Sequence, residues 1–141
     1  MSTKGITKLG RSEKVNGNIE SIAALFEAER EKNLSTWSSY WSEDARVTFG
    51  FDPVRPSSDL VGKETIVSET AEKFKVRRHS VIDAQIDSIG TGDEVLARVD
   101  VTIEFENDQK IKGPIVMIFS FDSEGKISQL IEYFNPSGFT S

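Results

Sequence analysis

The chain of 141 residues has no cysteine and only one histidine, His79. The absence of thiols excludes disulfides, thiolate nucleophiles and cysteine-bound metal centres, and one histidine cannot form a histidine-cluster metal site. No apolar run has transmembrane length, and the N-terminus has no signal-like apolar segment, so we expect a cytoplasmic location. The glycines at 90–92 lack the strand-to-helix context of a phosphate-binding loop, so they predict a hairpin turn. We expect no cofactor.

Positive charge is also scarce: 17 Lys and Arg stand against 23 Asp and Glu, which gives a net charge of −6. This balance argues against nucleic acid or an anionic membrane as the main partner, and favours a small-molecule ligand. Hydrophobic residues make up 37% and charged residues 28%, as in soluble globular domains. Residues 1–16 carry cations but little to bury, so we expect a flexible N-terminal arm followed by one domain at 17–141.

Hydrophobic periodicity predicts an α+β fold, with helices early in the chain and a meander of strands after them. Asn18 is a candidate N-cap for the first helix. The segments "GTGD", "ENDQ" and "DSEG" divide the later strands as turns. The expected helices are residues 18–33, 34–41 and 63–76, the expected strands are 45–51, 79–89, 94–106, 110–121 and 126–135, and a proline- and serine-rich loop is expected at 52–59.

The register of the last three strands decides whether Glu132, which lies in the apolar strand 126–135, shares a face of the sheet with other charged residues. If "ENDQ" and "DSEG" are two-residue hairpin loops, Asp100 lies opposite Ile115, which lies opposite Glu132, and Arg98 lies opposite Met117. Directly opposite side chains share a face of a sheet. On this register Arg98, Asp100 and Glu132 converge on one small molecule.

The alternation within residues 94–106 favours a different reading. Every second residue from Val95 is apolar, which is typical of a core-facing side, and Arg98 and Asp100 would then lie on the solvated reverse. A slip of one residue, which a bulge at Gly113-Pro114 could cause, exchanges the two readings.

The segment "ARVDV" followed by "GPIVMIFSFDSEGKISQLIEYFNP" resembles the limonene-1,2-epoxide hydrolase group of the SnoaL-like, nuclear transport factor 2-like superfamily. The "EYFNP" ending is also similar to phenazine-biosynthesis and ketosteroid-isomerase-related members. The resemblance implies a cone-shaped, curved antiparallel sheet that three N-terminal helices wrap around a deep apolar cavity.

The resemblance also implies roles for three charged residues. Asp100 corresponds to the general acid, Arg98 to the arginine that bridges two carboxylates, and Glu132 to the aspartate that activates water. Epoxide opening needs an acid on the oxygen and a base on the other side, so the two carboxyls must differ in protonation. However, Val47 and Phe49 occupy the places where the hydrolases hold water with a tyrosine and an asparagine.

The sequence therefore predicts a cofactor-independent acid–base enzyme that acts on a small apolar molecule of secondary-metabolite type. Epoxide opening with isomerisation or cyclisation is expected ahead of hydrolysis to a diol, and a non-catalytic ligand-binding or dimerisation module is the alternative of another class. Candidate substrate-binding residues are Trp37, Tyr40, Trp41, Phe49, Ile115, Met117, Phe119 and Phe134.

A homodimer is predicted from the same register. If Arg98 and Asp100 point inward, an apolar row points outward, and a patch of that extent is unusual on a soluble monomer. That row consists of Val95, Val99, Val101, Phe105, Val116 and Ile118.

Overall fold

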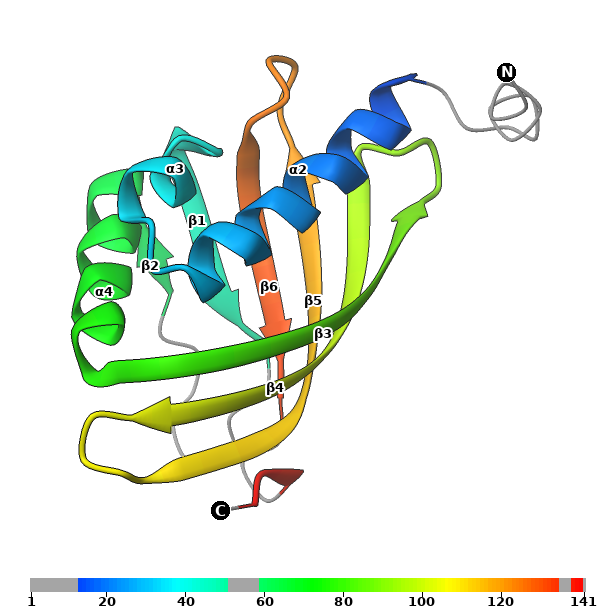
Figure 1. Cartoon of the computed structure of the whole chain (residues 1–141). Coiled ribbons are helices and arrows are strands. Elements are labelled where there is room, and N and C mark those ends of the chain that lie inside the picture. Colours follow the sequence, from blue (N-terminus) through cyan, green and yellow to red (C-terminus); the bar gives the residue numbers. More distant parts are fainter. Residues whose placement is uncertain (1–12, 51–58, 135–137, 141) are drawn as a thin grey trace.

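The computed structural model describes residues 13–50, 59–134 and 138–140, and it has the predicted α+β architecture. Within these residues, three helices lie on one side of a single curved, unclosed sheet of six strands (Figure 1). The helices are α2 (Glu13–Arg30), α3 (Leu34–Ser38) and α4 (Lys63–Val76), and the strands are β1 (Trp41–Phe49), β2 (Leu60–Val61), β3 (Arg77–Ile89), β4 (Glu94–Phe105), β5 (Lys110–Phe121) and β6 (Ile127–Tyr133).

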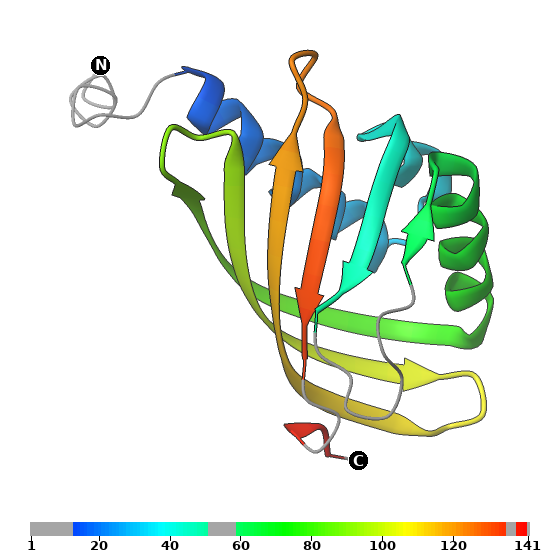
Figure 2. The same cartoon turned by 180° about the vertical axis from the view of Figure 1, so that it is seen from behind.

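The strand order is β2-β1-β6-β5-β4-β3. Strands β3 to β6 form the expected antiparallel meander, whereas β1 joins β6 in parallel. Helix α2 crosses the concave face of the sheet, and the outer face carries no described helix (Figure 2). This coverage gives the two faces different access to water.

The core fills the space between the concave face and the helices. Phe26 of α2 meets Phe119 of β5 edge to face at 6.1 Å between ring centroids, and Trp37 lies 5.0 Å from Trp41. Val95 and Ala97 of β4 are fully buried. Burial of this apolar surface is the main stabilising contribution to such a layer.

Helix α2 begins earlier than the sequence pattern indicates. It starts at Glu13, so residues 13–16, which we expected in the N-terminal arm, form its first turn, and residues 1–12 lie outside the described part. Asn18 is not its N-cap: its Nδ2 donates a hydrogen bond to the Gly92 carbonyl at 2.8 Å. This buried bond ties α2 to the turn between β3 and β4, which periodicity alone could not reveal.

Local boundaries differ where short elements meet. Helix α3 ends at Ser38, shorter than expected, because β1 already begins at Trp41. Asn33 caps α3, since its Oδ1 accepts a bond from the Thr36 N–H at 3.2 Å. Most of the expected loop at 52–59 lies outside the described residues, and the described chain resumes at Asp59, just before the short strand β2.

The predicted register between β4 and β5 is wrong by one residue. Asp100 lies opposite Pro114 and Arg98 opposite Val116. The cause is the turn, where the Phe105 N–H bonds to the Gln109 carbonyl and three residues stand between them. The last of these, Asp108, adopts the left-handed conformation with φ 70°, as in three-residue hairpin loops.

Between β5 and β6 two irregularities cancel in their effect on the sheet faces. The turn is again one residue longer than expected, with the Asp122 N–H bonded to the Lys126 carbonyl, and the register shifts once more between Ser120 and Phe121. Glu132 therefore lies opposite Met117, two residues from the predicted partner. An even shift leaves the side chain on the same face, so Glu132 points inward as expected.

The new register also changes the argument for a homodimer. Val95, Val99 and Val101 are buried on the inner face, so the expectation that they form an outward row is wrong. Phe105 has the same parity along β4 and packs against the core. Val116 and Ile118 do lie on the outer face, because they are opposite Arg98 and Leu96. No described helix is long and apolar enough to cross a membrane.

Candidate functional site

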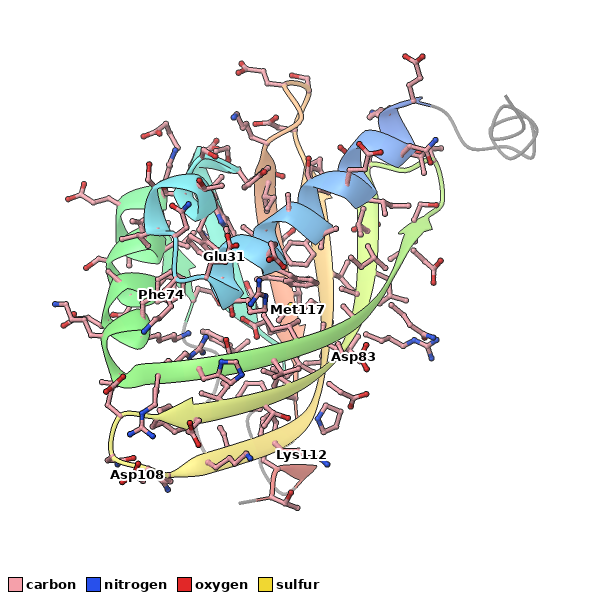
Figure 3. All side chains as sticks on the ribbon, in the orientation of Figure 1. Glu31, Phe74, Asp83, Asp108, Lys112 and Met117 are labelled. Carbon is pink, nitrogen blue, oxygen red and sulfur yellow. The ribbon has the colours of Figure 1, made fainter. Side chains whose placement is uncertain are left out.

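A pocket of about 830 Å³, including solvent at its mouth, opens between the concave face of the sheet and the three helices. The enclosed part of this space measures about 100 Å³. Figure 3 shows Met117 among the side chains that fill the space between the sheet and the helices. Of the candidate substrate-binding residues, six line the pocket: Trp37, Trp41, Phe49, Ile115, Met117 and Phe119.

Two of the candidate binding residues do not line this pocket. Tyr40 packs against the core at its edge, and Phe134 meets Phe139 edge to face at 6.0 Å. Phe134 follows the end of β6, so it lies beyond the stretch where inner-face side chains reach the pocket. The prediction for Phe134 assumed that the inner row of β6 continued to this residue, whereas the prediction for Tyr40 assumed a helix over residues 34–41 that borders the cavity, and that helix ends at Ser38.

Two acids line the pocket, and Glu132 is the one without an ion pair, since Glu29 is paired with Arg77. The side chain of Glu132 lies on β6, beside Phe49 of β1 and opposite Met117 of β5. Within the described residues its carboxyl group has no hydrogen-bond or ion-pair partner. Loss of solvent by burial raises the pKa of Glu132 to about 7, while the charges of Lys73 and Arg77 act in the opposite direction. A carboxyl group in this state can both accept and donate a proton near neutral pH.

Three further charged side chains face Glu132 from the helices and from the start of β3. Glu29 of α2 and Arg77 form an ion pair with 3.2 Å between Oε2 and Nη1, and the Trp37 indole N–H donates to the other oxygen of Glu29 at 3.2 Å. Lys73 of α4 has its Nζ 6.0 Å from the centre of the Phe49 ring. These groups make one side of an otherwise apolar pocket polar.

The pocket wall also contains an unsatisfied donor. Trp41 is 2% exposed, and its Nε1 is the one buried side-chain nitrogen or oxygen among the described residues without a hydrogen-bond partner. Thr70, the other buried polar residue of the wall, is satisfied because its hydroxyl donates to the Ile66 carbonyl at 2.9 Å. An unpaired buried N–H is costly and is often satisfied when a ligand binds.

The structure does not bring Arg98 and Asp100 to Glu132. Both side chains are exposed on the outer face of β4, where Arg98 donates to the Oε1 of Gln85 at 2.6 Å and Asp100 lies opposite Asp83 of β3. The expectation that they converge with Glu132 is therefore wrong. The three-residue turn after β4 places every side chain of β4 on the opposite face from the predicted one. The alternation of apolar residues from Val95 was the signal that predicted this correctly.

The places where epoxide hydrolases of the resembling group hold water are apolar. Val47 and Phe49 both line the pocket. Thr48, the polar residue between them, lies opposite Ile131 and so faces outward with it. Val47 and Phe49 therefore offer no side-chain hydrogen bond to a water beside Glu132.

Sequence reasoning missed Glu29, Lys73 and Arg77, although a signal existed for two of them. Glu29 follows Leu25 and Phe26 by four and three residues, which places it on the buried stripe of α2. Lys73 follows Thr70 by three residues on α4 in the same way. No group of three or more His, Cys, Asp or Glu side chains in the described part of the chain could hold a metal ion.

Comparison with known proteins agrees with this architecture. The model of the SnoaL-like domain family matches residues 22–130. A search of curated proteins finds no match. Among solved structures, the chain is similar to RV0760c of Mycobacterium tuberculosis, solved in complex with estradiol-17β-hemisuccinate, with 15% identity and a TM-score of 0.76 over 89% of this chain and 98% of that one.

Two other similar structures are those of enzymes. An LEH-like epoxide hydrolase of M. tuberculosis shares 14% identity, with a TM-score of 0.71 over 87% of this chain and 86% of that one. SalBIII, an epoxide hydrolase/cyclase-like enzyme in pyran ring formation of the polyether salinomycin, shares 17% identity, with a TM-score of 0.73 over 86% and 93%. At these identities the similarity establishes a common fold.

Proposed function

Because the chain belongs to the SnoaL-like domain family, we propose that it is a cofactor-independent acid–base enzyme that isomerises or cyclises a small, largely apolar molecule. Glu132 is its proton-transfer group. The observation that carries this proposal is a single unpaired carboxyl group in an apolar pocket, with a pKa of about 7. Proton transfer is most efficient when the pKa of the catalytic group lies near the working pH.

One carboxyl group suffices for an isomerisation. The ionised form of Glu132 removes a proton from a carbon next to a carbonyl group, and the protonated form then returns it at another position of the same substrate. A double bond moves, the carboxylate is regenerated, and no water is consumed. An apolar wall around the reacting atoms keeps bulk water from competing for the proton.

A cyclisation uses the same group in the other direction. Protonated Glu132 donates its proton to an opening epoxide oxygen, while a hydroxyl group of the same substrate attacks the carbon from the opposite side and loses its own proton to water at the pocket mouth, and Glu132 regains a proton from solvent after the ring has closed. The similarity to SalBIII, which is linked to pyran ring formation, supports this form of the proposal. Terpenoid or polyketide intermediates are the substrate class of this size and polarity.

Hydrolysis to a diol is disfavoured by the geometry. It requires a water held for attack within about 3 Å of the carbon. Val47 and Phe49 give such a water no polar partner, and Arg98 and Asp100 lie on the other face of the sheet. A reaction run in oxygen-18 water should therefore leave the product unlabelled, and incorporation of the label as a diol would restore the hydrolase assignment.

The second candidate function is non-catalytic binding of a small ligand. It is favoured by the unpaired Trp41 N–H in the pocket wall, which suits a ligand acceptor whether or not chemistry follows. The complex of RV0760c with a steroid ester supports the same idea for this fold. The two candidates differ in whether Glu132 is needed for turnover.

A proton-exchange assay separates them. We would incubate the protein in deuterium oxide with β,γ-unsaturated ketones that range from cyclohex-3-enone to a steroid, and follow exchange and double-bond migration by NMR. The proposal predicts both signals for at least one ketone and their loss in Glu132→Gln, with Asp100→Asn unaffected. Bound ketones that show neither exchange nor migration would favour the binding function.

A further inference from the structure

Lys73 is the lysine that lines the pocket, and it forms no hydrogen bond or ion pair with any described residue. Its neighbours on α4 are engaged: Lys63 lies 3.6 Å from Glu43, and Lys75 lies 2.7 Å from Glu72. A charged ammonium group without a counter-ion at a pocket is available to a ligand.

The position of Lys73 relates it to Glu132. Its Nζ lies over the ring of Phe49, and Phe49 is the register partner of Glu132 on the neighbouring strand. Both charged groups therefore lie beside Phe49, at the same end of the pocket. Lys73 acts on Glu132 through space and not through a direct ion pair.

The charge of the polar wall is not balanced. Arg77 is neutralised by its ion pair with Glu29. When Glu132 is protonated, Lys73 carries the one uncompensated charge among these four groups. A ligand with a single negative charge would complete the balance, and electrostatic complementarity of this kind selects one ligand class over another.

We propose that the ligand is an amphiphilic monocarboxylate, whose carboxylate pairs with Lys73 while its apolar body fills the pocket beside Glu132. This inference deepens the proposed function by naming a substrate class, and it rests on that function only for the location of the ligand. Lys73 is then a specificity-determining residue. A charge-assisted hydrogen bond of this type changes affinity by about tenfold or more.

Binding of the carboxylate should depend on pH. The groups that face Glu132 are Glu29 from α2, Lys73 from α4 and Arg77 from β3. A second anion in this cluster favours the protonated form of Glu132, so carboxylate binding takes up a proton and weakens as pH rises through about 7. A neutral ligand of the same shape lacks this coupling.

The test uses two probes of nearly equal shape, naphthalene-2-carboxylate and its methyl ester, titrated calorimetrically at about pH 6. We expect the native protein to prefer the carboxylate. Lys73→Gln should weaken carboxylate binding about tenfold and change ester binding by less than about twofold. Lys73→Arg keeps the positive charge and should retain the preference for the carboxylate. Lys75→Gln is the matched control: Lys75 lies two residues further along α4 and is already paired with Glu72, so its replacement should leave both affinities unchanged.

Three results would overturn the inference: no binding of the carboxylate to the native protein, ester binding as tight as carboxylate binding, or equal effects of Lys73→Gln on both probes. The last result would mean that Lys73 affects ligand binding only through its electrostatic effect on the ionisation of Glu132. Because Lys73 is exposed, circular dichroism should show an intact fold for each variant. If the carboxylate proposal fails, the role of Glu132 in turnover is still tested by the exchange assay, so the two proposals can fail separately.

Discussion

The two faces of one sheet place carboxylates in opposite environments. Asp100 on the outer face is exposed to solvent, whereas Glu132 on the inner face is buried in a largely apolar pocket, where loss of solvent raises its pKa to about 7. The two residues lie on strands separated by a single strand, β5. For Glu132, the loss of water is the largest cause of a pKa that allows proton exchange near neutral pH.

The difference originates in the curvature of the sheet and its helices. Helices α2, α3 and α4 cover the concave face and exclude water from it, while no described helix covers the outer face (Figures 1 and 2). A charged row such as Arg98 and Asp100 is tolerated only where it remains hydrated. The inner acid is retained at an energetic cost, which is typical of a functional group.

The largest expected effect comes from exchanging each acid for its amide. Glu132→Gln should reduce turnover by about 100-fold or more, because general acid–base catalysis contributes on that order. Asp100→Asn should leave turnover within about twofold, since its side chain does not reach the pocket. Steady-state rates on a substrate found by the exchange assay check both, and equal losses would mean that the two faces are functionally linked.

The stability of the Glu132→Gln variant should show the next largest effect. The pKa of Glu132 is raised from 4.5 to about 7 by folding, so the folded state binds the proton more tightly and native stability falls as pH rises through this window. Glutamine has no such dependence. The free energy of unfolding of the variant relative to the native protein should therefore grow by up to about 3 kcal/mol between about pH 4.5 and pH 8.

Urea denaturation at several pH values measures this difference, with Asp100→Asn as the matched control. The control changes an acid outside the pocket, so a pH dependence that only Glu132→Gln alters is assigned to the pocket. A constant difference between Glu132→Gln and the native protein would mean that the carboxyl group is already ionised and hydrated in the folded state.

A homodimer remains a prediction, and its surface is now the outer apolar patch, which consists of Leu96, Val116, Ile118, Ile131 and Tyr133. Tyr133 is 41% exposed. We expect light scattering at micromolar concentration to show a dimer, and Ile118→Glu to weaken it by about tenfold or more through the burial of an unpaired charge. A monomeric native protein would contradict this prediction and leave the patch without a partner.

The smallest effect is expected at Arg98. Its hydrogen bond to Gln85 lies on the exposed outer face, where such contacts contribute little. Arg98→Gln should change the free energy of unfolding by less than about 0.5 kcal/mol and leave ligand affinity unchanged. A large loss of affinity would place Arg98 in contact with the site and contradict the observed register.

The sequence predicted the elements well and the register poorly, for a physical reason. Helix α4 has the expected bounds, because the stripe through Ile66 and Phe74 is strongly periodic. Register depends on turn length, and "ENDQ" does not show whether its loop has two or three residues, because both Asn107 and Asp108 tolerate the left-handed conformation. The face of Glu132 was predicted correctly only because the longer turn and the shift after Ser120 add to an even number.

The charged residues on the polar side of the pocket could not be predicted from the sequence, for another reason. Glu29 and Arg77 are 48 positions apart, and only the crossing of α2 over the sheet brings them together. Periodicity places a charged residue on a buried stripe, but it does not say which distant charge it meets. Lys73 belongs to the same class of residue.

The most direct test of this account is the titration of Glu132 itself, which needs no substrate. Carbon-13 NMR of protein labelled at the glutamate side-chain carboxyl groups, with Glu132→Gln to assign the resonance, gives its midpoint. The account predicts a midpoint near pH 7. A midpoint near 4.5, the ordinary value for glutamate, would show a hydrated carboxylate and contradict the proposal that Glu132 is the proton-transfer group.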